Sequence, residues 1–390
     1  MLFSYFQISS YFQTSSYLRI GSYLQNGLMD ALVAARQVQA DPGFIVGPIA
    51  ALFGFILNWT FRLAYAITPN NSLGFAIILL TIIAMTIMLP LGIKSQKSMT
   101  KMQKLGPEVE KIKAKYGGST DPEIKKKINT ETQALYAKHK VNPLGGCLPM
   151  LIQMPLFFGI LYIMQQSFLY IDTLGELYVN LARAIQAVPD YLQIVEPLSR
   201  AYIPDAWVTT GERILAYMNA GHSYSAAVEL AGGNYINLTN PNHLARVINR
   251  FQSEDWAYLF EAVPSAYLPR IQELYASKNN IVVFFGISLL ENSGMAWPGV
   301  IIPFFTVLST VGQSWLSQLV NKPKDDKAKT QQTIMMVVMP IFMGFITITM
   351  PAGVGLYWIF SNLFRLVQQI IMNAKEGIKF RLPFVKASEA

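Results

Sequence analysis

One face of the apolar segment near the C-terminus carries side chains that could bind polar or charged groups. Four of them recur at i, i+4, i+7 and i+11 of a helix: Trp358, Asn362, Arg365 and Gln369. An arginine within an apolar helix attracts anions, and an ionisable residue inside a membrane span is a functional candidate by default. The alternative is that Arg365 extends to the headgroups of the inner leaflet.

The chain lacks the common signatures of an enzyme. Its only cysteine is Cys147, and its histidines, at positions 139, 222 and 243, lie far apart. There is no metal-ligand spacing, glycine-rich phosphate loop or nucleophile elbow. We therefore expect a protein that is not an enzyme and that binds no metal or cofactor.

The composition is that of a membrane protein. Of 390 residues, 52% are hydrophobic and only 14% are charged, whereas a soluble domain has about 25% charged residues. The net charge of +8 is typical of basic cytosolic loops, and nucleic acid is the weaker interpretation.

Five segments are apolar enough to cross a bilayer, which needs about 20 residues each. They are residues 73–93, 144–168, 296–320, 333–349 and 353–372. The hinge Met350–Gly353 allows only a tight turn, so the last two predict a helical hairpin. The predicted fold class is an all-α polytopic membrane protein with five transmembrane helices.

Charge predicts the orientation of these spans. From Gly92 to Pro143 there are 12 Lys/Arg against 5 Asp/Glu, and from Tyr170 to Asn280 there are 7 against 11. Because basic loops stay cytosolic, the N-terminus is expected outside, and the link 321–332 and the tail 373–390 inside.

Two N-terminal segments precede the first span. In residues 47–72, Asn58, Arg62 and Tyr65 share one face, which favours an amphipathic interfacial helix over a sixth span. In residues 1–46, tyrosines at 5, 11, 17 and 23 follow serines every six residues. We expect a disordered tail, and translation starting at Met29 is an alternative.

Residues 94–143 predict a basic cytosolic hairpin of two helices. An apolar seam marks the first helix: Met102, Leu105, Val109, Ile112 and Tyr116. The second begins with Asp121 as N-cap and Pro122 at N1. The candidate docking residues for an acidic partner, a nascent chain or ribosomal RNA are Lys101, Lys104, Lys125, Lys126 and Lys127. The alternative is a solvated loop without a partner.

The junction that follows, Lys138–Pro155, has an unusual composition for the mouth of a span. Three prolines, two glycines and Gln153 disturb the backbone or place a polar group where water is scarce.

Several of these motifs together resemble a known family. They are Leu89-Pro90-Leu91, Leu105-Gly106-Pro107, the run from Val141 to Pro149, Ile152-Gln153-Met154-Pro155, Met350-Pro351-Ala352-Gly353, Leu356-Tyr357-Trp358 and Ser361-Asn362. In this order they are similar to the YidC-type membrane protein insertases, relatives of the mitochondrial Oxa and chloroplast Albino proteins. The resemblance covers roughly residues 73–168 and 296–373.

The resemblance implies a hydrophilic groove, open to cytosol and lipid, through which new membrane proteins enter the bilayer without nucleotide hydrolysis. It implies nascent membrane proteins and lipids as partners, with the ribosome, the signal recognition machinery and the Sec channel as further candidates. DNA is not expected. A chaperone role belongs to the same expectation, and the implied location is the bacterial plasma membrane.

The sequence departs from the family at one position. Members usually carry an arginine five residues before the Pro90 position, where this chain has Met85. Both Met85 and Arg365 lie about 14–15 Å from the basic edge of their predicted spans. Our hypothesis is that Arg365 supplies the positive charge of the groove in place of Met85.

Other groove candidates are Thr86, Gln153 and Gln313, and Trp358 stands where the family has an aromatic residue that contacts substrate. The alternative role of these side chains is interhelical hydrogen bonding.

Residues 169–295 predict an extracytoplasmic α-helical insertion where the family typically has a short loop. Helix starts are expected at Thr210, Asn240-Pro241, Ser253 and Tyr267. Its role is either a stabilising cap or the docking of a partner.

A small-molecule transporter or channel is the competing function. That class usually shows inverted repeats with broken helices at the midplane, which this sequence lacks. Crosslinking through Trp358 distinguishes the two, since an insertase captures a nascent chain and a transporter captures a solute.

Overall fold

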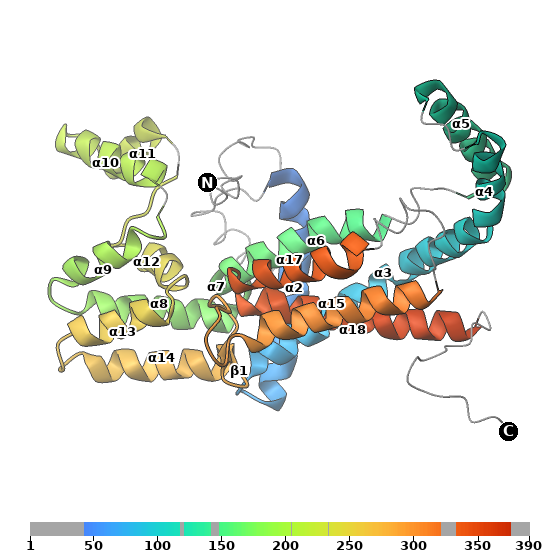
Figure 1. The fold of residues 1–390 in the computed structure, drawn as a ribbon. Helices are drawn as coiled ribbons and strands as arrows, with labels where there is room; N and C mark the ends of the chain where they lie inside the picture. The colour runs from blue at the N-terminus through green and yellow to red at the C-terminus, as the bar shows by residue number, and fades with distance from the viewer. Residues whose placement is uncertain are drawn as a thin grey trace. The chain divides into compact units, whose positions relative to one another are not determined.

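The computed structural model describes residues 43–117, 121–141, 148–203, 205–232, 234–320 and 333–375. Residues 1–42, the link 321–332, the last 15 residues and junction residues 142–147 lie outside this range. Residues 43–46 of the predicted tail 1–46 belong to a helix that starts at Gly43. The described residues are mainly helical (Figure 1). They divide into two compact units, which are taken separately below.

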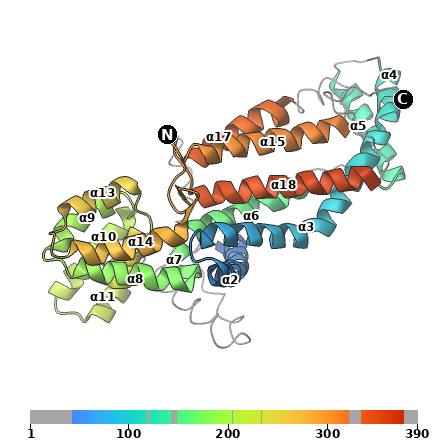
Figure 2. The same cartoon turned by 90° about the horizontal axis from the view of Figure 1, so that it is seen from below.

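The first unit comprises Met1–Leu80, Pro155–Ile302 and Thr347–Leu356. Its insertion is built on α8 (Asp172–Gln186), which packs against α7 (Ser167–Tyr170), α12 (Pro241–Ile248) and α14 (Leu268–Val282). Helix α8 buries the residues that recur every three or four positions: Leu174, Tyr178, Leu181, Ala182 and Ile185. In Figures 1 and 2, α8 and α14 lie side by side and run in opposite directions.

Two smaller helix pairs complete the insertion. Helices α9 (Tyr191–Ser199) and α13 (Ser253–Ala262) contact each other, and α10 (Asp205–Asn219) packs on α11 (Tyr224–Ala231). The last pair has a small core of its own, made of Ile214, Ala227 and Ala231.

One of the predicted helix starts of the insertion is confirmed, and another is wrong. Asn240 caps α12 as expected, and its side chain accepts from the Asn242 amide at 2.9 Å. The start at Thr210 is wrong, because α10 already begins at Asp205. Threonine can lie inside a helix when its hydroxyl is satisfied, and here the Thr210 Oγ1 accepts from Arg213 at 3.2 Å.

The fold is all-α as predicted, with one short strand pair between the helices of the insertion. Strands β1 (Val283–Phe284) and β2 (Ile287–Ser288) form an antiparallel hairpin. Its two turn residues, Phe285 and Gly286, both have positive φ, as a two-residue hairpin turn of this kind requires. The aromatic and β-branched residues that flank the glycine favour strands here.

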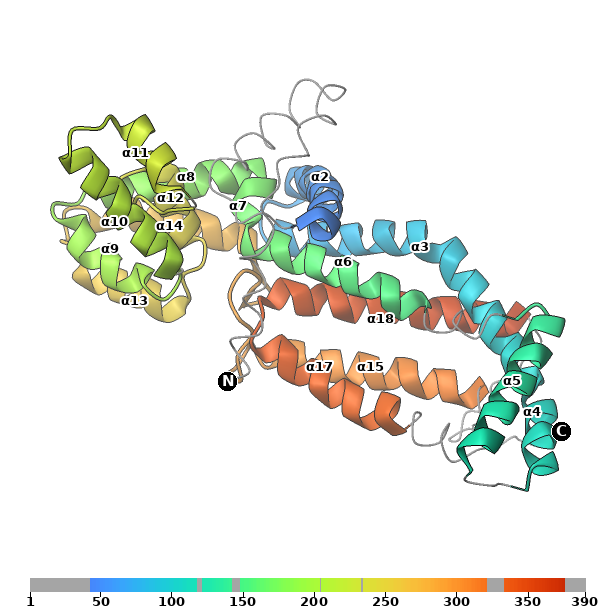
Figure 3. The same ribbon diagram turned by 90° about the horizontal axis from the view of Figure 1, so that it is seen from above.

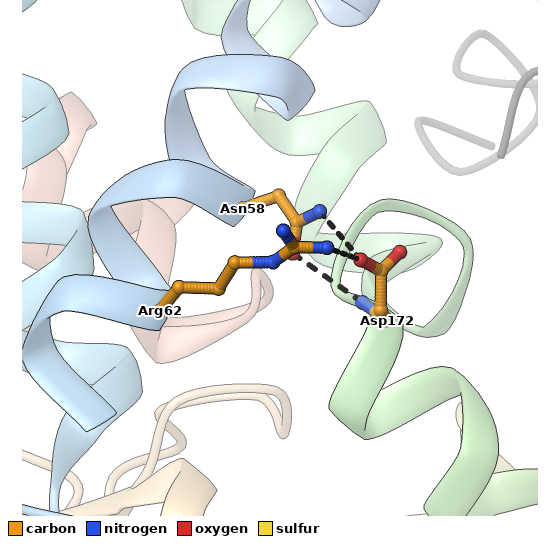
Figure 4. A network of polar contacts seen from close by, with 3 residues as sticks. All are labelled: Asn58, Arg62 and Asp172. Atoms are coloured by element: carbon orange, nitrogen blue, oxygen red, sulfur yellow. Dashed lines mark hydrogen bonds and ion pairs between the residues drawn. The ribbon is translucent and has the colours of Figure 1, made fainter. Parts of the chain in front are cut away.

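Helix α2 (Gly43–Ile67) is tied to the insertion by polar contacts (Figure 4). The Asn58 Nδ2 donates to Asp172 Oδ2 at 2.9 Å, and the Arg62 guanidinium forms an ion pair with the same carboxylate. Two residues of the polar face predicted for 47–72 therefore point at the first residue of α8. The third, Tyr65, stacks on Phe61.

The second unit comprises Thr81–Met154, Pro303–Ile346 and Tyr357–Ala390. Helix α3 (Ser72–Lys104) starts in the first unit and continues here as one helix through the predicted boundary at residue 94. The hairpin consists of α4 (Gly106–Lys115) and α5 (Pro122–Lys138). The Asp121 cap of α5 is confirmed, since Oδ1 accepts from the Glu123 amide at 2.8 Å.

The predicted continuous first helix of the hairpin is wrong. The apolar seam from Met102 to Tyr116 is interrupted at Leu105, the N-cap of α4. Pro107 lies in the first turn of α4, where a proline is tolerated because its missing amide hydrogen has no partner there, whereas in the middle of a longer helix it would cost a hydrogen bond.

The remaining helices are α6 (Leu148–Gln165), α15 (Ile301–Val320), the π-helix η5 (Ile334–Val338), α17 (Met339–Ile348) and α18 (Ala352–Lys375). Figure 3 shows α15 beside α17. A methyl group at Gly344 of α17 would lie 2.4 Å from the Val307 side chain, so the glycine permits this close approach. Only three residues separate α17 from α18, as the tight turn predicts.

Two helices qualify as membrane spans by length and composition among the described residues, Val46–Ile67 and Ser72–Ser98. Three shorter apolar helices cover Gln153–Gln165, Ile301–Ser317 and Met336–Ile348. The number of spans and the interfacial placement of residues 47–72 therefore stay predictions.

Candidate substrate-binding site

Polar side chains of α18 and α15 bond to each other within the second unit. The Asn362 Nδ2 donates to Ser309 Oγ at 3.1 Å and to Thr310 Oγ1 at 2.9 Å. The Trp358 indole nitrogen donates to the same Thr310 hydroxyl at 3.3 Å. Both amide hydrogens of Asn362 are thus used, and Trp358 and Asn362 face α15 together, as their spacing predicts.

Arg365 points toward α6, where it meets Gln153. Its guanidinium donates to the side-chain oxygen of Gln153, and the Gln153 Nε2 donates to the Tyr357 hydroxyl at 3.4 Å. Gln153 is buried, with 5% of its surface exposed. The structure thus brings together two of the predicted site residues, Gln153 and Arg365, which stand 212 positions apart.

The hydrogen-bond partner of the charged Arg365 side chain is a neutral amide. In the part of the chain that the structure describes, no carboxylate forms an ion pair with it. An amide oxygen satisfies one donor of the guanidinium without cancelling its charge. The pair therefore keeps a net positive charge on the face of α18.

The depth of Arg365 relative to Met85 follows from a contact between α3 and α18. A methyl group at Gly92 would lie 2.7 Å from the Gln368 Nε2, so the two helices meet at this level. Arg365 precedes Gln368 by three residues, and Met85 precedes Gly92 by seven. With a rise of 1.5 Å per residue, Arg365 lies about 6 Å, or one turn, closer to the contact than Met85 does.

The other predicted site residues lie outside this cluster. Met85 is buried in α3, whereas Thr86 is exposed and donates to the Ile82 carbonyl of its own helix at 2.7 Å. Gln313 is partly buried on α15. Gln369 is buried, and among the described residues its Nε2 has no hydrogen-bond partner.

Three residues of the cluster were missed from the sequence: Tyr357, Ser309 and Thr310. A signal for the last two was present. In the apolar segment of α15, polar side chains recur with helical spacing at Thr306, Ser309, Thr310, Gln313 and Ser317. Tyr357 has no such signal, because a tyrosine in an apolar helix is usually part of the core.

The candidate docking lysines lie on two helices. Lys101 is exposed near the end of α3, and the three consecutive lysines at 125–127 are exposed on α5. Lys104 is the last residue of α3, and its side chain is not among those that the structure describes.

Helices α4 and α5 are joined by a small polar cluster. The Glu131 Oε1 accepts from Tyr116 Oη at 2.6 Å and from Lys115 Nζ at 2.9 Å. The hydrogen bonds from Tyr116 and Lys115 lower the pKa of Glu131, and Glu131 raises the pKa of Lys115. These groups are solvent-exposed, so the cluster orients the hairpin more than it stabilises it.

The sequence profile of the family described as 60Kd inner membrane protein matches residues 64–208 and 257–378, more than half of the chain. The chain belongs to this family. The matched ranges include α3 to α9 and α14 to α18, and therefore every residue of the cluster. Residues 209–256 lie between the two matched ranges, so the match extends into the predicted insertion 169–295 from both ends.

Relatives of this 60Kd inner membrane protein family member carry the name of an insertase. The chain is similar to the membrane protein insertase YidC of Anaeromyxobacter sp. (strain Fw109-5), with 46% identity over 118 residues, which are 30% of this chain and 20% of the relative. With YidC of Fusobacterium nucleatum it shares 38% identity over 130 residues, which are 33% of this chain and 58% of the relative. With the membrane protein insertase MisCA of Bacillus subtilis it shares 39% identity over 140 residues, which are 34% of this chain and 49% of the relative. The chain thus spans between a fifth and three fifths of the length of these relatives.

Proposed function

We propose that this protein is a membrane protein insertase of the bacterial inner membrane. The family match and the names of the relatives support this function. Substrates on this proposal are newly made membrane proteins, and no catalytic chemistry is involved.

The observation that carries the proposal is the charge of Arg365, which has no carboxylate partner among the residues that the structure describes. A polar segment that crosses about 30 Å of hydrocarbon loses its hydration, and each unsatisfied polar group costs several kcal/mol there. A cation whose hydrogen-bond partner among the described residues is the Gln153 amide offers such a segment an attractive partner within the apolar region. It thereby lowers the barrier for acidic groups in particular.

The proposed mechanism uses exchange of hydrogen-bond partners. A substrate carboxylate or carbonyl replaces the Gln153 oxygen at the guanidinium, while the bond between Gln153 and Tyr357 keeps the amide nearby. The bond from the guanidinium to Gln153 has one ionised partner, whereas a carboxylate adds the opposite charge and a second acceptor oxygen, so the exchange favours acidic groups. On this proposal five helices enclose the polar groove, with Arg365 in the role that the family assigns to the Met85 position.

The basic hairpin is the proposed receiving element. Its exposed lysines would attract acidic substrate segments or the ribosome before insertion, and such attraction weakens with salt. The signal recognition machinery and the Sec channel are further proposed partners.

Insertion into proteoliposomes tests the role of Arg365. Arg365→Met should lower the insertion rate of a substrate with an acidic translocated tail by about tenfold, equivalent to about 1.4 kcal/mol. A substrate whose tail lacks acidic residues should be affected little.

A second variant separates lost charge from damaged packing. Met85→Arg added to Arg365→Met should restore insertion of the acidic substrate, because it returns a cation to the face of α3. Unchanged insertion of acidic tails by Arg365→Met would contradict the proposal.

A further inference from the structure

Two arginines of the insertion, one buried and one partly buried, have no acidic partner among the described residues. Arg246 on α12 is 4% exposed, and Arg250 follows the end of this helix and is partly buried. Within the described part of the chain neither forms an ion pair, and the Nη1 of Arg246 has no hydrogen-bond partner. Since buried charges in proteins are normally paired, these cations are a favourable place for an anion.

The two guanidinium groups remain charged and influence each other. Burial, followed by the nearby charge of Arg250, lowers the pKa of Arg246 to about 10. Burial also lowers the pKa of Arg250, which the phenols of Tyr162 and Tyr202 partly offset. A pKa of about 10 is far above neutral pH, and arginine is effectively always protonated, so both groups are cations.

The neighbouring groups that the structure describes do not neutralise these cations. The Trp207 ring centre lies 4.5 Å from the Arg246 guanidinium carbon. The free energy of this cation–π contact is smaller than the hydration free energy that the guanidinium loses on burial. The Asn249 side chain is already engaged, because its Nδ2 donates to the Gln165 carbonyl and its Oδ1 accepts from Ser167, both at 3.0 Å.

The arginines lie close to the end of α6. Tyr162, which influences both of them, belongs to the last turns of that helix. On the predicted topology this end of α6 is at the outer surface of the membrane, where both lipid headgroups and soluble anions are present.

We propose that Arg246 and Arg250 form a binding site for a phosphate-class oxyanion. The planar, forked donors of arginine match the oxygens of such a group, and the buried Nη1 of Arg246 has no hydrogen-bond partner among the described residues. The source is either the headgroup of an outer-leaflet phospholipid or free phosphate. The site is independent of the proposed insertase function.

Thermal unfolding of the purified full chain in an uncharged detergent tests the site. Inorganic phosphate, compared with chloride at equal ionic strength, should raise the Tm by about 2–4 °C, because a ligand that binds only the folded state stabilises it. In a second arm, short-chain phosphatidylglycerol replaces phosphate. A rise with phosphate alone assigns the site to the free anion, and a rise with the lipid alone assigns it to a headgroup.

Variants decide whether the arginines are responsible. Arg246→Met should abolish the rise without lowering the Tm measured in chloride, because an apolar side chain of similar volume removes an unpaired buried charge. Arg250→Met carries the same expectation if Arg246→Met does not fold. Arg270→Met is the matched control, since Arg270 is exposed on α14 and paired with Glu273, and its rise should equal that of the unaltered chain. No rise in either arm, or an equal rise in the Arg246→Met and Arg270→Met variants, would overturn the proposal.

Discussion

At the residue scale, Gln153 combines burial with a cationic neighbour. A buried amide must satisfy both its donor and its acceptor, and here Arg365 takes the oxygen while Tyr357 takes the nitrogen. The arrangement satisfies Gln153 and leaves the charge in place. A carboxylate at the same position would satisfy Arg365 equally well but would neutralise it.

This difference predicts the behaviour of Gln153→Glu. The variant should fold, because its carboxylate can pair with Arg365, and its Tm should stay within a few degrees of the original. Insertion of acidic-tailed substrates should fall by about tenfold, since the attractive charge is cancelled. Insertion of a tail without acidic residues provides the control, and normal insertion of acidic tails would contradict the role given to Arg365.

Part of the candidate site could be predicted from the sequence. Helical spacing is a local property, so the shared direction of Trp358 and Asn362 toward other polar groups followed from it. The partner of Arg365 did not, because contact across 212 positions depends on how the helices pack. Spacing placed Arg365 on the face of Asn362, but its long side chain reaches a different helix.

At the element scale, α12 is held by a histidine that must stay neutral. The Nδ1 of the buried His243 accepts a hydrogen bond from the Asn237 amide at 2.9 Å, which a protonated ring could not do. Burial and then the charge of Arg246 lower the pKa of His243 from 6.5 to about 4. Folding therefore excludes a proton that the unfolded chain binds.

The insertion should consequently lose stability in mild acid. Because the folded pKa is the lower one, the stabilisation is complete above pH 6.5 and is lost as the pH falls toward 4. The total loss is about 3 kcal/mol at 1.36 kcal/mol per pKa unit. Hydrogen exchange of α12, corrected for the intrinsic rate, measures it. His243→Asn keeps an acceptor without a titrating ring and should remove this pH dependence, whereas an unchanged profile would exclude His243 as its cause.

Local signals predicted some elements better than others. The Asp121 cap and the tight turn before α18 rest on residues with strong backbone preferences, and both are present. The break at Leu105 was missed because the apolar spacing continues across it, although Gly106 and Pro107 were visible. The hairpin around Phe285 was missed because a short apolar run fits a helix as well as a strand.

At the scale of the whole molecule, the insertion is attached through two antiparallel helices. Since α8 and α14 pack together in opposite directions, the first turn of one lies beside the last turn of the other (Figure 2). Asn280 also accepts a backbone hydrogen bond from Asn71 at 2.8 Å, next to the start of α3. The chain thus leaves for the insertion and returns from it at neighbouring points.

This geometry predicts that the insertion can be removed. Replacement of residues 173–279 by a short Gly/Ser linker should leave a folded membrane protein, because the closing points are close and the loop entropy is small. Insertion of a simple substrate should stay within about twofold of the original rate, an effect of about 0.4 kcal/mol. A linker with the same residues in scrambled order is the control. If a folded variant no longer inserts substrate into the membrane, residues 173–279 have a role beyond that of a cap.

The π-helix η5 has a consequence for how this chain tolerates change in length. A π-helical turn contains about one residue more than an α-helical turn, so it accommodates a single added residue without disturbing the helix on either side. Deletion of one residue within 334–338 should therefore convert η5 into regular α-helix and keep Gly344 of α17 in contact with Val307. The same deletion inside α17 would turn every later side chain by about 100° and separate that contact. Length variation between related sequences is thus expected at η5 and not in the helix that follows it.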